Sequence, residues 1–138
     1  MFLSAENMLG GYGETTILND CSISVKKGEI AVIVGPNGAG KSTAMKAIFG
    51  MLNLRVGNII FDGKDISDLK PQERVKSGMG FVPQTHNVFT SMTVMENLEI
   101  GGFTNQENLP KNISEVFKLF PVLEEKQKQL VGELSGGQ

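Results

Sequence analysis

The sequence has no tryptophan, and it has one cysteine, one histidine and one tyrosine among its 138 residues. The single cysteine, Cys21, excludes an internal disulfide, which fits a reducing compartment, and we expect it to pack as a small apolar residue. The longest apolar run, Ile30 to Val34, is too short to span a bilayer, and the N-terminus lacks the basic and apolar stretches of a signal peptide. The net charge of −2 gives no reason to expect nucleic-acid binding. The remaining composition, 40% hydrophobic and 20% charged, is that of one modest globular domain.

A glycine-rich stretch, Gly35 to Thr43, carries the strongest functional signal. It reads GPNGAGKST and matches G-x-x-x-x-G-K-[ST], the phosphate-binding P-loop. Glycines let the backbone bend around an anion with its N–H groups inward, Lys41 can reach the outer phosphates, and the Ser42 hydroxyl can bind Mg²⁺. We predict a catalytic role for Lys41 and a nucleotide site formed by Gly35, Asn37, Gly38, Ala39, Gly40, Lys41, Ser42 and Thr43. The alternative is a glycine turn without a ligand.

The residues on either side of this stretch suit a P-loop. Glu29 to Val34 is a short β-branched run that predicts a buried parallel strand, and Thr43 to Phe49 predicts a helix that ends at Gly50. Phosphate would then lie at a helix N-terminus, where free N–H groups and the helix dipole favour it.

The first 84 residues predict mixed α/β structure. We expect an edge strand over 2–8, a turn over 10–13, strands over 15–18 and 21–25 with a turn at 19–20 between them, and a turn at 26–28. Further on we expect strands over 57–61 and 79–82, a tight turn at 62–63, and a helix over 71–77 that ends at Gly78.

The residues after Gln84 predict mostly helix. Thr93 and Glu96 form a capping-box pattern ahead of a helix over 94–100, which two glycines end. A second helix places Ile113, Val116, Phe117 and Phe120 on one face and ends at Pro121, and 124–129 is expected to be helical. The interpretation is a single α/β domain over 1–138, with a β and P-loop part over 1–84 and a helical part over 85–138.

The last five residues of the sequence, Leu134 to Gln138, read LSGGQ. An α/β nucleotide-binding sheet needs more parallel strands than these residues supply. We therefore expect the sequence to be the N-terminal part of a longer protein.

Three motifs in this order resemble those of the ATP-binding-cassette (ABC) ATPases, the nucleotide-binding subunits of ABC transporters. They are the P-loop at 35–43, Gln84 after an apolar segment, and LSGGQ at 134–138. Five shorter stretches resemble the ATP-binding subunits of branched-chain amino acid importers. They are GYG at 11–13, FVPQ at 81–84, NVF at 87–89, TVMENL at 93–98 and LFPVL at 119–123. The resemblance covers the whole chain and implies a P-loop NTPase core, here incomplete, with an N-terminal antiparallel β subdomain and a helical subdomain.

The resemblance also implies roles outside the P-loop. Tyr12 matches the aromatic residue that stacks on adenine, and Gln84 matches a catalytic glutamine thought to contact Mg²⁺ and the attacking water and to sense the membrane partner. Ser135, Gly136 and Gly137 match the signature that binds the γ-phosphate of ATP held by a second subunit. The implied cofactors are ATP and Mg²⁺, and the implied partners are a second ATPase subunit and integral membrane permease subunits. The implied location is peripheral, on the cytoplasmic face of the membrane, where ATP hydrolysis drives import of a small solute.

The family's second acidic motif and its switch histidine follow the signature and are not among these residues. His86 is expected to be a surface loop residue rather than that switch. Because phosphoryl transfer needs a positioned metal and water, we expect these residues alone to hydrolyse ATP very poorly. Three alternatives stay open: an ABC-type protein acting on ribosomes or DNA, a P-loop kinase, and an inactive remnant. No heptad run or basic patch supports the first, and the second leaves LSGGQ unexplained.

Overall fold

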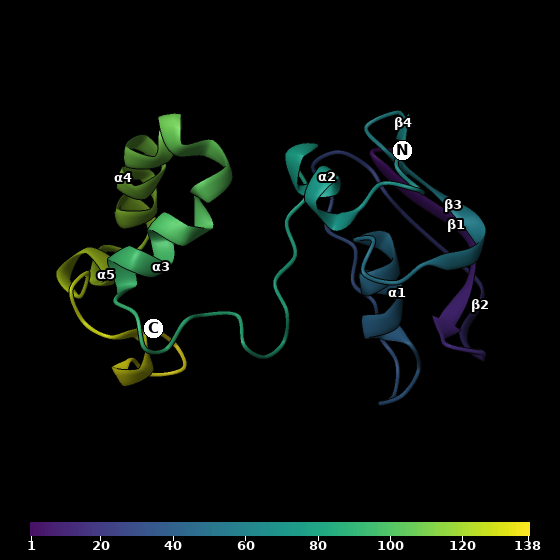
Figure 1. Cartoon of the computed structure of the whole chain (residues 1–138), viewed down its shortest axis with the longest axis horizontal. Helices are drawn as coiled ribbons and strands as arrows, with labels where there is room; N and C mark the ends of the chain where they lie inside the picture. The colour runs from purple at the N-terminus through teal and green to yellow at the C-terminus, as the bar shows by residue number, and fades with distance from the viewer. The chain divides into compact units, whose positions relative to one another are not determined.

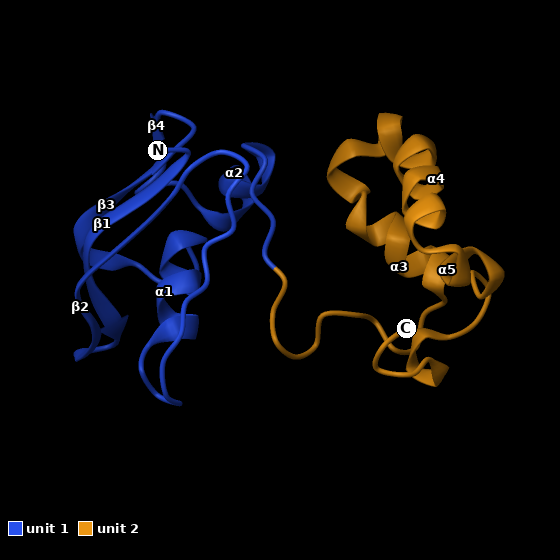
Figure 2. Ribbon diagram, turned by 180° about the vertical axis from the view of Figure 1, so that it is seen from behind, with its two compact units in different colours: residues 1–81 blue, residues 82–138 orange.

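A four-stranded antiparallel sheet forms the N-terminal part of the protein. The computed structural model describes all 138 residues, which form two compact units, 1–81 and 82–138 (Figure 1 and Figure 2). Strands β1 (Leu3–Tyr12), β2 (Thr15–Val25), β3 (Leu54–Phe61) and β4 (Lys64–Asp65) lie in the order β2-β1-β3-β4. The strand predicted over 2–8 is confirmed, but it continues to Tyr12, and the prediction that it lies at the edge of the sheet is wrong, because β1 pairs with both β2 and β3. The two units meet between residues 81 and 82, close to the boundary after residue 84 that the sequence predicts. The division of the domain into a β and P-loop part and a helical part stays a prediction.

Strand β2 runs unbroken through the turn that was predicted at Asn19-Asp20. Asp20 and, across the pair on β1, Asn7 have positive φ angles of 53° and 52°, and the register between the strands shifts there. The Asn7 amide donates a hydrogen bond to the Asp20 carboxylate (3.2 Å), and the Asn7 backbone N–H donates one to the Ser22 hydroxyl (2.9 Å). The turn prediction is wrong because Asn and Asp occupy left-handed conformations in bulges as readily as in turns.

The other local signals in this unit are mostly confirmed. Asp62 and Gly63, both with positive φ, form the tight turn between β3 and β4. Helix α1 (Lys41–Ile48) and helix α2 (Pro71–Lys76) lie where helices were expected. The predicted turn over 10–13 is displaced: Gly10 to Tyr12 belong to β1, and the turn is Gly13-Glu14.

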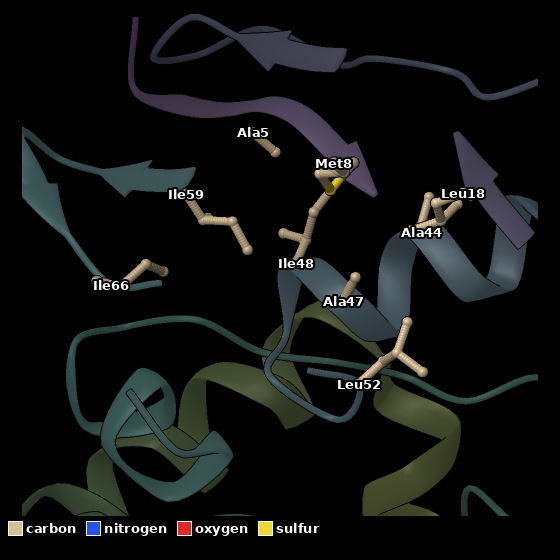
Figure 3. Close-up of a cluster of buried hydrophobic side chains, with 9 residues drawn as sticks. All are labelled: Ala5, Met8, Leu18, Ala44, Ala47, Ile48, Leu52, Ile59 and Ile66. Carbon is tan, nitrogen blue, oxygen red and sulfur yellow. The ribbon is translucent and has the colours of Figure 1, made fainter. Parts of the chain in front are cut away.

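One face of the sheet packs on helix α1. Ala44, Ala47 and Ile48 of the helix join Met8 of β1 and Ile59 of β3 in one buried cluster (Figure 3). Figure 3 labels its nine members: Ala5, Met8, Leu18, Ala44, Ala47, Ile48, Leu52, Ile59 and Ile66. Full burial of a Met or Ile side chain stabilises by about 1.5–3 kcal/mol. This cluster therefore fixes α1, and with it the P-loop, against the sheet.

Two predicted strands are not formed. The segments 29–34 and 79–82 pair with no other strand. Within the first, Ile30, Val32 and Val34 are 93%, 78% and 83% exposed rather than buried. A parallel strand exists only by exchanging backbone hydrogen bonds with a neighbour, so β-branched composition alone does not produce one.

The second unit is helical. It contains α3 (Val94–Gly101), the 3₁₀ helix η1 (Phe103–Asn108), α4 (Leu109–Leu119), α5 (Pro121–Glu125) and the 3₁₀ helix η2 (Val131–Glu133). The predicted helices over 94–100 and around Val116 are confirmed, although Phe120 lies beyond the end of α4 and is exposed. No helix in either unit combines the length and apolar composition that crossing a bilayer requires.

The helix predicted over 124–129 is mostly wrong, because α5 begins at Pro121 and ends at Glu125. The carbonyls of Gln127 and Gln129 accept hydrogen bonds from Met95 N–H and Val94 N–H, each at 3.0 Å. Because these carbonyls serve a tertiary pairing with the start of α3, residues 126–129 form turns instead of continuing the helix.

Candidate nucleotide-binding site

The P-loop lies between the extended segment 29–34 and helix α1. Gly38 and Gly40 have φ angles of 84° and 82°, a left-handed conformation that residues with a side chain rarely adopt. A Cβ at Gly40 would also lie 3.3 Å from Ile17 Cγ2 on β2. The loop therefore needs glycine at these two positions to reach the start of α1.

The N-terminus of α1 is open. Gly40 is its N-cap, no side chain accepts a hydrogen bond there, and the first turn contains no acidic residue. Helices α2 and α3 differ, because Glu73 accepts from the Lys70 N–H (2.9 Å) and Glu96 from the Thr93 N–H (2.7 Å). The first turn of α1 consequently keeps N–H groups for an outside acceptor, with the positive end of the helix dipole behind them. A phosphate group fits this donor set.

The Lys41 side chain bends back over the loop. Its ammonium donates hydrogen bonds to the carbonyls of Gly35 (2.8 Å) and Pro36 (2.7 Å). These acceptors are neutral, so an anionic phosphate oxygen can replace them with a stronger, charge-assisted bond. The Ser42 side chain is exposed and free to reach a cation, whereas the Thr43 side chain is buried, which leaves Thr43 its backbone N–H for binding.

Tyr12 lies beside the P-loop helix. It is the last residue of β1, its side chain is 49% exposed, and Lys46 Nζ of α1 lies 3.5 Å from its hydroxyl and 5.9 Å from its ring centroid. Arg55 of β3 donates to the Thr16 hydroxyl (2.8 Å) and to the Gly13 carbonyl, which holds the turn after Tyr12. Sequence reasoning missed Lys46 and Arg55, because neither belongs to a local pattern.

A cavity of about 320 Å³ lies between β2 and the P-loop. Its lining includes Ile17 and Cys21 of β2, Val34, and Gly40 and Lys41 at the start of α1. Cys21 therefore packs as a half-buried wall residue, consistent with the expectation of a small apolar role.

Gln84 and the LSGGQ residues belong to the second unit. Gln84 and His86 are exposed in the irregular segment that precedes α3. Ser135, Gly136 and Gly137 form an exposed turn in which Gln138 N–H donates to the Ser135 carbonyl (2.9 Å). The Gln138 side-chain oxygen accepts from the Ser135 N–H (3.2 Å) and from Lys126 Nζ (3.1 Å). Tyr12 thus lies next to the helix that follows the P-loop, whereas Gln84 and Ser135 to Gly137 belong to the other compact unit, where no hydrogen bond joins Gln84 to the LSGGQ turn.

The segment that leads into LSGGQ pairs with the segment that leads into α3. Val131 N–H donates to the Met92 carbonyl (2.9 Å) and Gly132 N–H to the Thr90 carbonyl (3.0 Å). A Cβ at Gly132 would lie 2.9 Å from the Thr90 oxygen, so the close approach depends on glycine. The position of the LSGGQ turn within its unit is set by this pairing.

Comparison with known proteins decides the family. The sequence profile described as ABC transporter matches residues 18–138. The chain belongs to the ABC transporter family. The P-loop kinase alternative does not fit this membership, whereas the α/β cassette expected from the resemblance is confirmed.

Two curated relatives show where in the ABC family the chain lies. It is 42% identical over 129 residues to the probable branched-chain amino acid transport ATP-binding protein LivF of Archaeoglobus fulgidus, covering 93% of the chain and 55% of the relative. It is 36% identical over 137 residues to the high-affinity branched-chain amino acid transport ATP-binding protein BraG of Pseudomonas aeruginosa, covering 99% of the chain and 59% of the relative.

Solved ABC cassettes share the fold. One is a nucleotide-free ATP-binding cassette from an ABC transporter, 37% identical with a TM-score of 0.78, for which the match covers 99% of this chain and 60% of that one. Another is the ADP conformation of an ATP-binding cassette, 34% identical with a TM-score of 0.81, covering 99% and 59%. The chain thus spans between 55% and 60% of the length of these four proteins.

Proposed function

We propose that this chain is the nucleotide-binding part of an ABC transporter subunit that couples ATP binding and hydrolysis to import of a small solute. The observation that carries the proposal is the open N-terminus of α1 behind the P-loop, where neither a side-chain cap nor a carboxylate competes with phosphate. The family membership of residues 18–138 supports it independently.

Different residues of the first unit bind the phosphates and the adenine of ATP in this proposal. The backbone N–H groups from Gly38 to Thr43 bind the phosphate oxygens, and Lys41 exchanges its contacts with the Gly35 and Pro36 carbonyls for the outer phosphates. Tyr12 supplies a half-exposed ring for the adenine, for which stacking contributes about 1–3 kcal/mol.

Mg²⁺ would be held by the Ser42 hydroxyl together with the phosphates. The family resemblance alone adds Gln84, from the second unit, as a further ligand. No group of three or more His, Cys, Asp or Glu side chains lies close enough to hold a metal ion without the nucleotide. Mg²⁺ commonly keeps several waters and binds through substrate phosphates. When bound, the ion supplies charge neutralisation on the phosphates.

The residues of the second unit would act on partners. In this proposal Ser135, Gly136 and Gly137 contact the γ-phosphate of ATP held by a second ATPase subunit. Gln84 responds to an integral membrane permease subunit and contacts the metal and the attacking water. The subunit is then peripheral, on the cytoplasmic face of the membrane. The turn at 135–137 is exposed and closed by its own hydrogen bonds, so it can meet another molecule without refolding.

Branched-chain amino acids are the solute class that the comparisons favour. LivF and BraG, at 42% and 36% identity, are named for their transport. The lipopolysaccharide export protein LptB of Escherichia coli is 33% identical over 140 residues, and it defines a competing class of cargo. Co-purification with permease subunits supports the proposal, whereas co-purification with ribosomes or DNA supports a non-transport ABC protein.

Calorimetric titration with MgATP tests the nucleotide site. Lys41→Ala removes the ammonium that faces the phosphates, and we expect at least about a tenfold loss of affinity, the equivalent of roughly 1.4 kcal/mol. Lys64→Ala, which removes an exposed lysine from β4, is the matched control and should bind as the wild type does. Equal affinity for all three proteins would contradict the assignment of Lys41.

Sedimentation with MgATP tests the second site. Ser135→Arg should leave binding to the monomer within about twofold of wild type but abolish dimer formation driven by ATP, because the arginine side chain would occupy the shared phosphate position. Loss of nucleotide binding by the monomeric variant would show that Ser135 belongs to the site of its own chain instead.

A further inference from the structure

Arg74 is a buried charged residue that the proposed mechanism does not use. It lies on α2, its exposed fraction is 2%, and no carboxylate forms an ion pair with it. Burial lowers the pKa of Arg74, and the charge of Asp68 raises it. Arginine stays protonated in proteins, so the cation must be stabilised by other acceptors.

Those acceptors are backbone carbonyls from two places. Arg74 Nη1 donates to the carbonyls of Ala47 (3.2 Å) and Ile48 (2.6 Å), the last residues of α1. Nε donates to the Leu69 carbonyl (2.9 Å), and Nη2 donates to the Ser67 carbonyl (2.7 Å). Four of the five guanidinium N–H donors thus have a carbonyl acceptor.

The contact at α1 lies at the end of the helix opposite the P-loop. The last carbonyls of a helix lack intrahelical partners and carry the negative end of its dipole, so a cation there is stabilising. Gly50 makes the approach possible: its φ is 80°, and a Cβ there would lie 2.8 Å from Arg74 Nε. Lys41 starts α1 and Arg74 holds its C-terminal end, so the one helix connects both residues.

The backbone of Arg74 holds a second segment. Its carbonyl accepts hydrogen bonds from Met79 N–H (3.1 Å) and from the Ser77 hydroxyl (2.7 Å), which fixes the exit from α2. Two residues further on, Phe81 stacks on Phe49, the residue after α1, with ring centroids 5.3 Å apart. Position 74 therefore contacts the end of the P-loop helix through its guanidinium and the start of the segment that leads to Gln84 through its backbone carbonyl; only the first contact depends on arginine.

We propose that Arg74 is a positioning residue for nucleotide binding: its planar guanidinium sets the position of α1 along its axis, and thereby the position of the P-loop N–H groups at its other end. The inference rests on the proposed function. A displacement of about 1 Å at a binding site reduces its effectiveness strongly, so a site at the far end of a short rigid helix is sensitive to this anchor.

Three variants of the full chain separate positioning from general stability. Arg74→Met removes both the planar set of N–H donors and the charge. Arg74→Lys keeps the charge, but a lysine ammonium cannot bind four carbonyls as the planar guanidinium does. Lys76→Met removes an exposed cation from the same helix as a control. Each variant is titrated with MgATP by calorimetry, at a temperature where circular dichroism shows it folded.

We expect Arg74→Met to bind MgATP at least tenfold more weakly, Arg74→Lys about threefold more weakly, and Lys76→Met as the wild type does. If Arg74→Met does not fold, Arg74→Lys decides the question. Lower melting temperatures with dissociation constants within twofold of wild type for the folded Arg74 variants would overturn the inference, because burial alone would then explain the residue. Failure of the folded wild type to bind MgATP would instead overturn the proposed function.

Discussion

The Asn97 side chain binds both backbone groups of Phe89. Its oxygen accepts from the Phe89 N–H (2.8 Å), and its amide nitrogen donates to the Phe89 carbonyl (3.0 Å) and to the Thr93 carbonyl (2.9 Å). The half-buried Asn97 amide thus fixes the backbone of the loop before α3 by hydrogen bonds, while the Phe89 side chain is 55% exposed. This explains part of the TVMENL motif: Thr93 and Glu96 cap the helix, and Asn97 fixes the loop that enters it.

Asn97→Ala should destabilise the second unit by about 1–3 kcal/mol, because it leaves the Phe89 N–H and two carbonyls without these partners. Urea unfolding followed by circular dichroism measures the change. Glu99→Ala, an exposed substitution on the same helix, serves as the control and should stay within about 0.5 kcal/mol of wild type. A null effect for Asn97→Ala would mean that these hydrogen bonds do not persist in solution.

Gly57 faces the bulge of β1. Its φ is 108°, and a Cβ there would lie 2.6 Å from the Glu6 carbonyl oxygen and 2.9 Å from that of Asn7. We expect Gly57→Ala to destabilise the protein by roughly 3 kcal/mol or more, since backbone strain of about 1–3 kcal/mol adds to a steric overlap. Gly63→Ala carries similar backbone strain in open space and should cost only about 1–2 kcal/mol. Equal midpoints of urea unfolding for the two variants would show that β1 and β3 do not approach this closely.

The adenine role of Tyr12 predicts a dependence on the ring rather than on the hydroxyl. Tyr12→Ala should weaken MgATP binding by about tenfold, from the loss of roughly 1–3 kcal/mol of stacking. Tyr12→Phe keeps the ring and should bind within about twofold of wild type, although it loses the contact of 3.5 Å with Lys46. Calorimetry on both variants checks this, and an affinity for Tyr12→Ala that matches Tyr12→Phe would exclude stacking.

The capping box of α3 predicts a pH dependence of stability. Hydrogen bonds from the Thr93 backbone N–H and then its hydroxyl lower the pKa of Glu96 in the folded state. A depressed folded pKa stabilises the protein above the unfolded pKa of about 4.3, and this contribution is lost as the pH falls through the folded value. The difference in unfolding free energy between wild type and Glu96→Gln should therefore be constant near neutral pH and should shrink in acid. Glu99→Gln is the control, and a difference that grows in acid would have the wrong sign.

Much of the local structure could be predicted from the sequence because its causes are local. The cap of α3 at Thr93, the end of α2 just before Gly78 and the turn at Asp62-Gly63 follow from residues that satisfy or bend their own backbone. The P-loop could be predicted for the same reason: its glycines and Lys41 act within nine consecutive residues.

Features that depend on distant partners could not be predicted. The composition of 29–34 indicates a strand, but a strand needs a neighbour, and none pairs with it here. The interior place of β1 depends on β3, which follows it by more than forty residues. Arg74 reads as an ordinary surface cation of a short helix, and only the fold shows that it binds the carbonyls of Ala47 and Ile48.

The central claim is that the backbone N–H groups between Gly38 and Thr43 bind the phosphates of ATP. Amide NMR spectra of the ¹⁵N-labelled protein, titrated with MgATP, test it most directly. We predict that the largest shifts fall on amides of Gly38 to Thr43, while the capped amides of Val94 to Glu96 stay in place in the monomer. Binding that leaves the Gly38 to Thr43 amides unshifted, or no binding by the folded protein, would contradict the account.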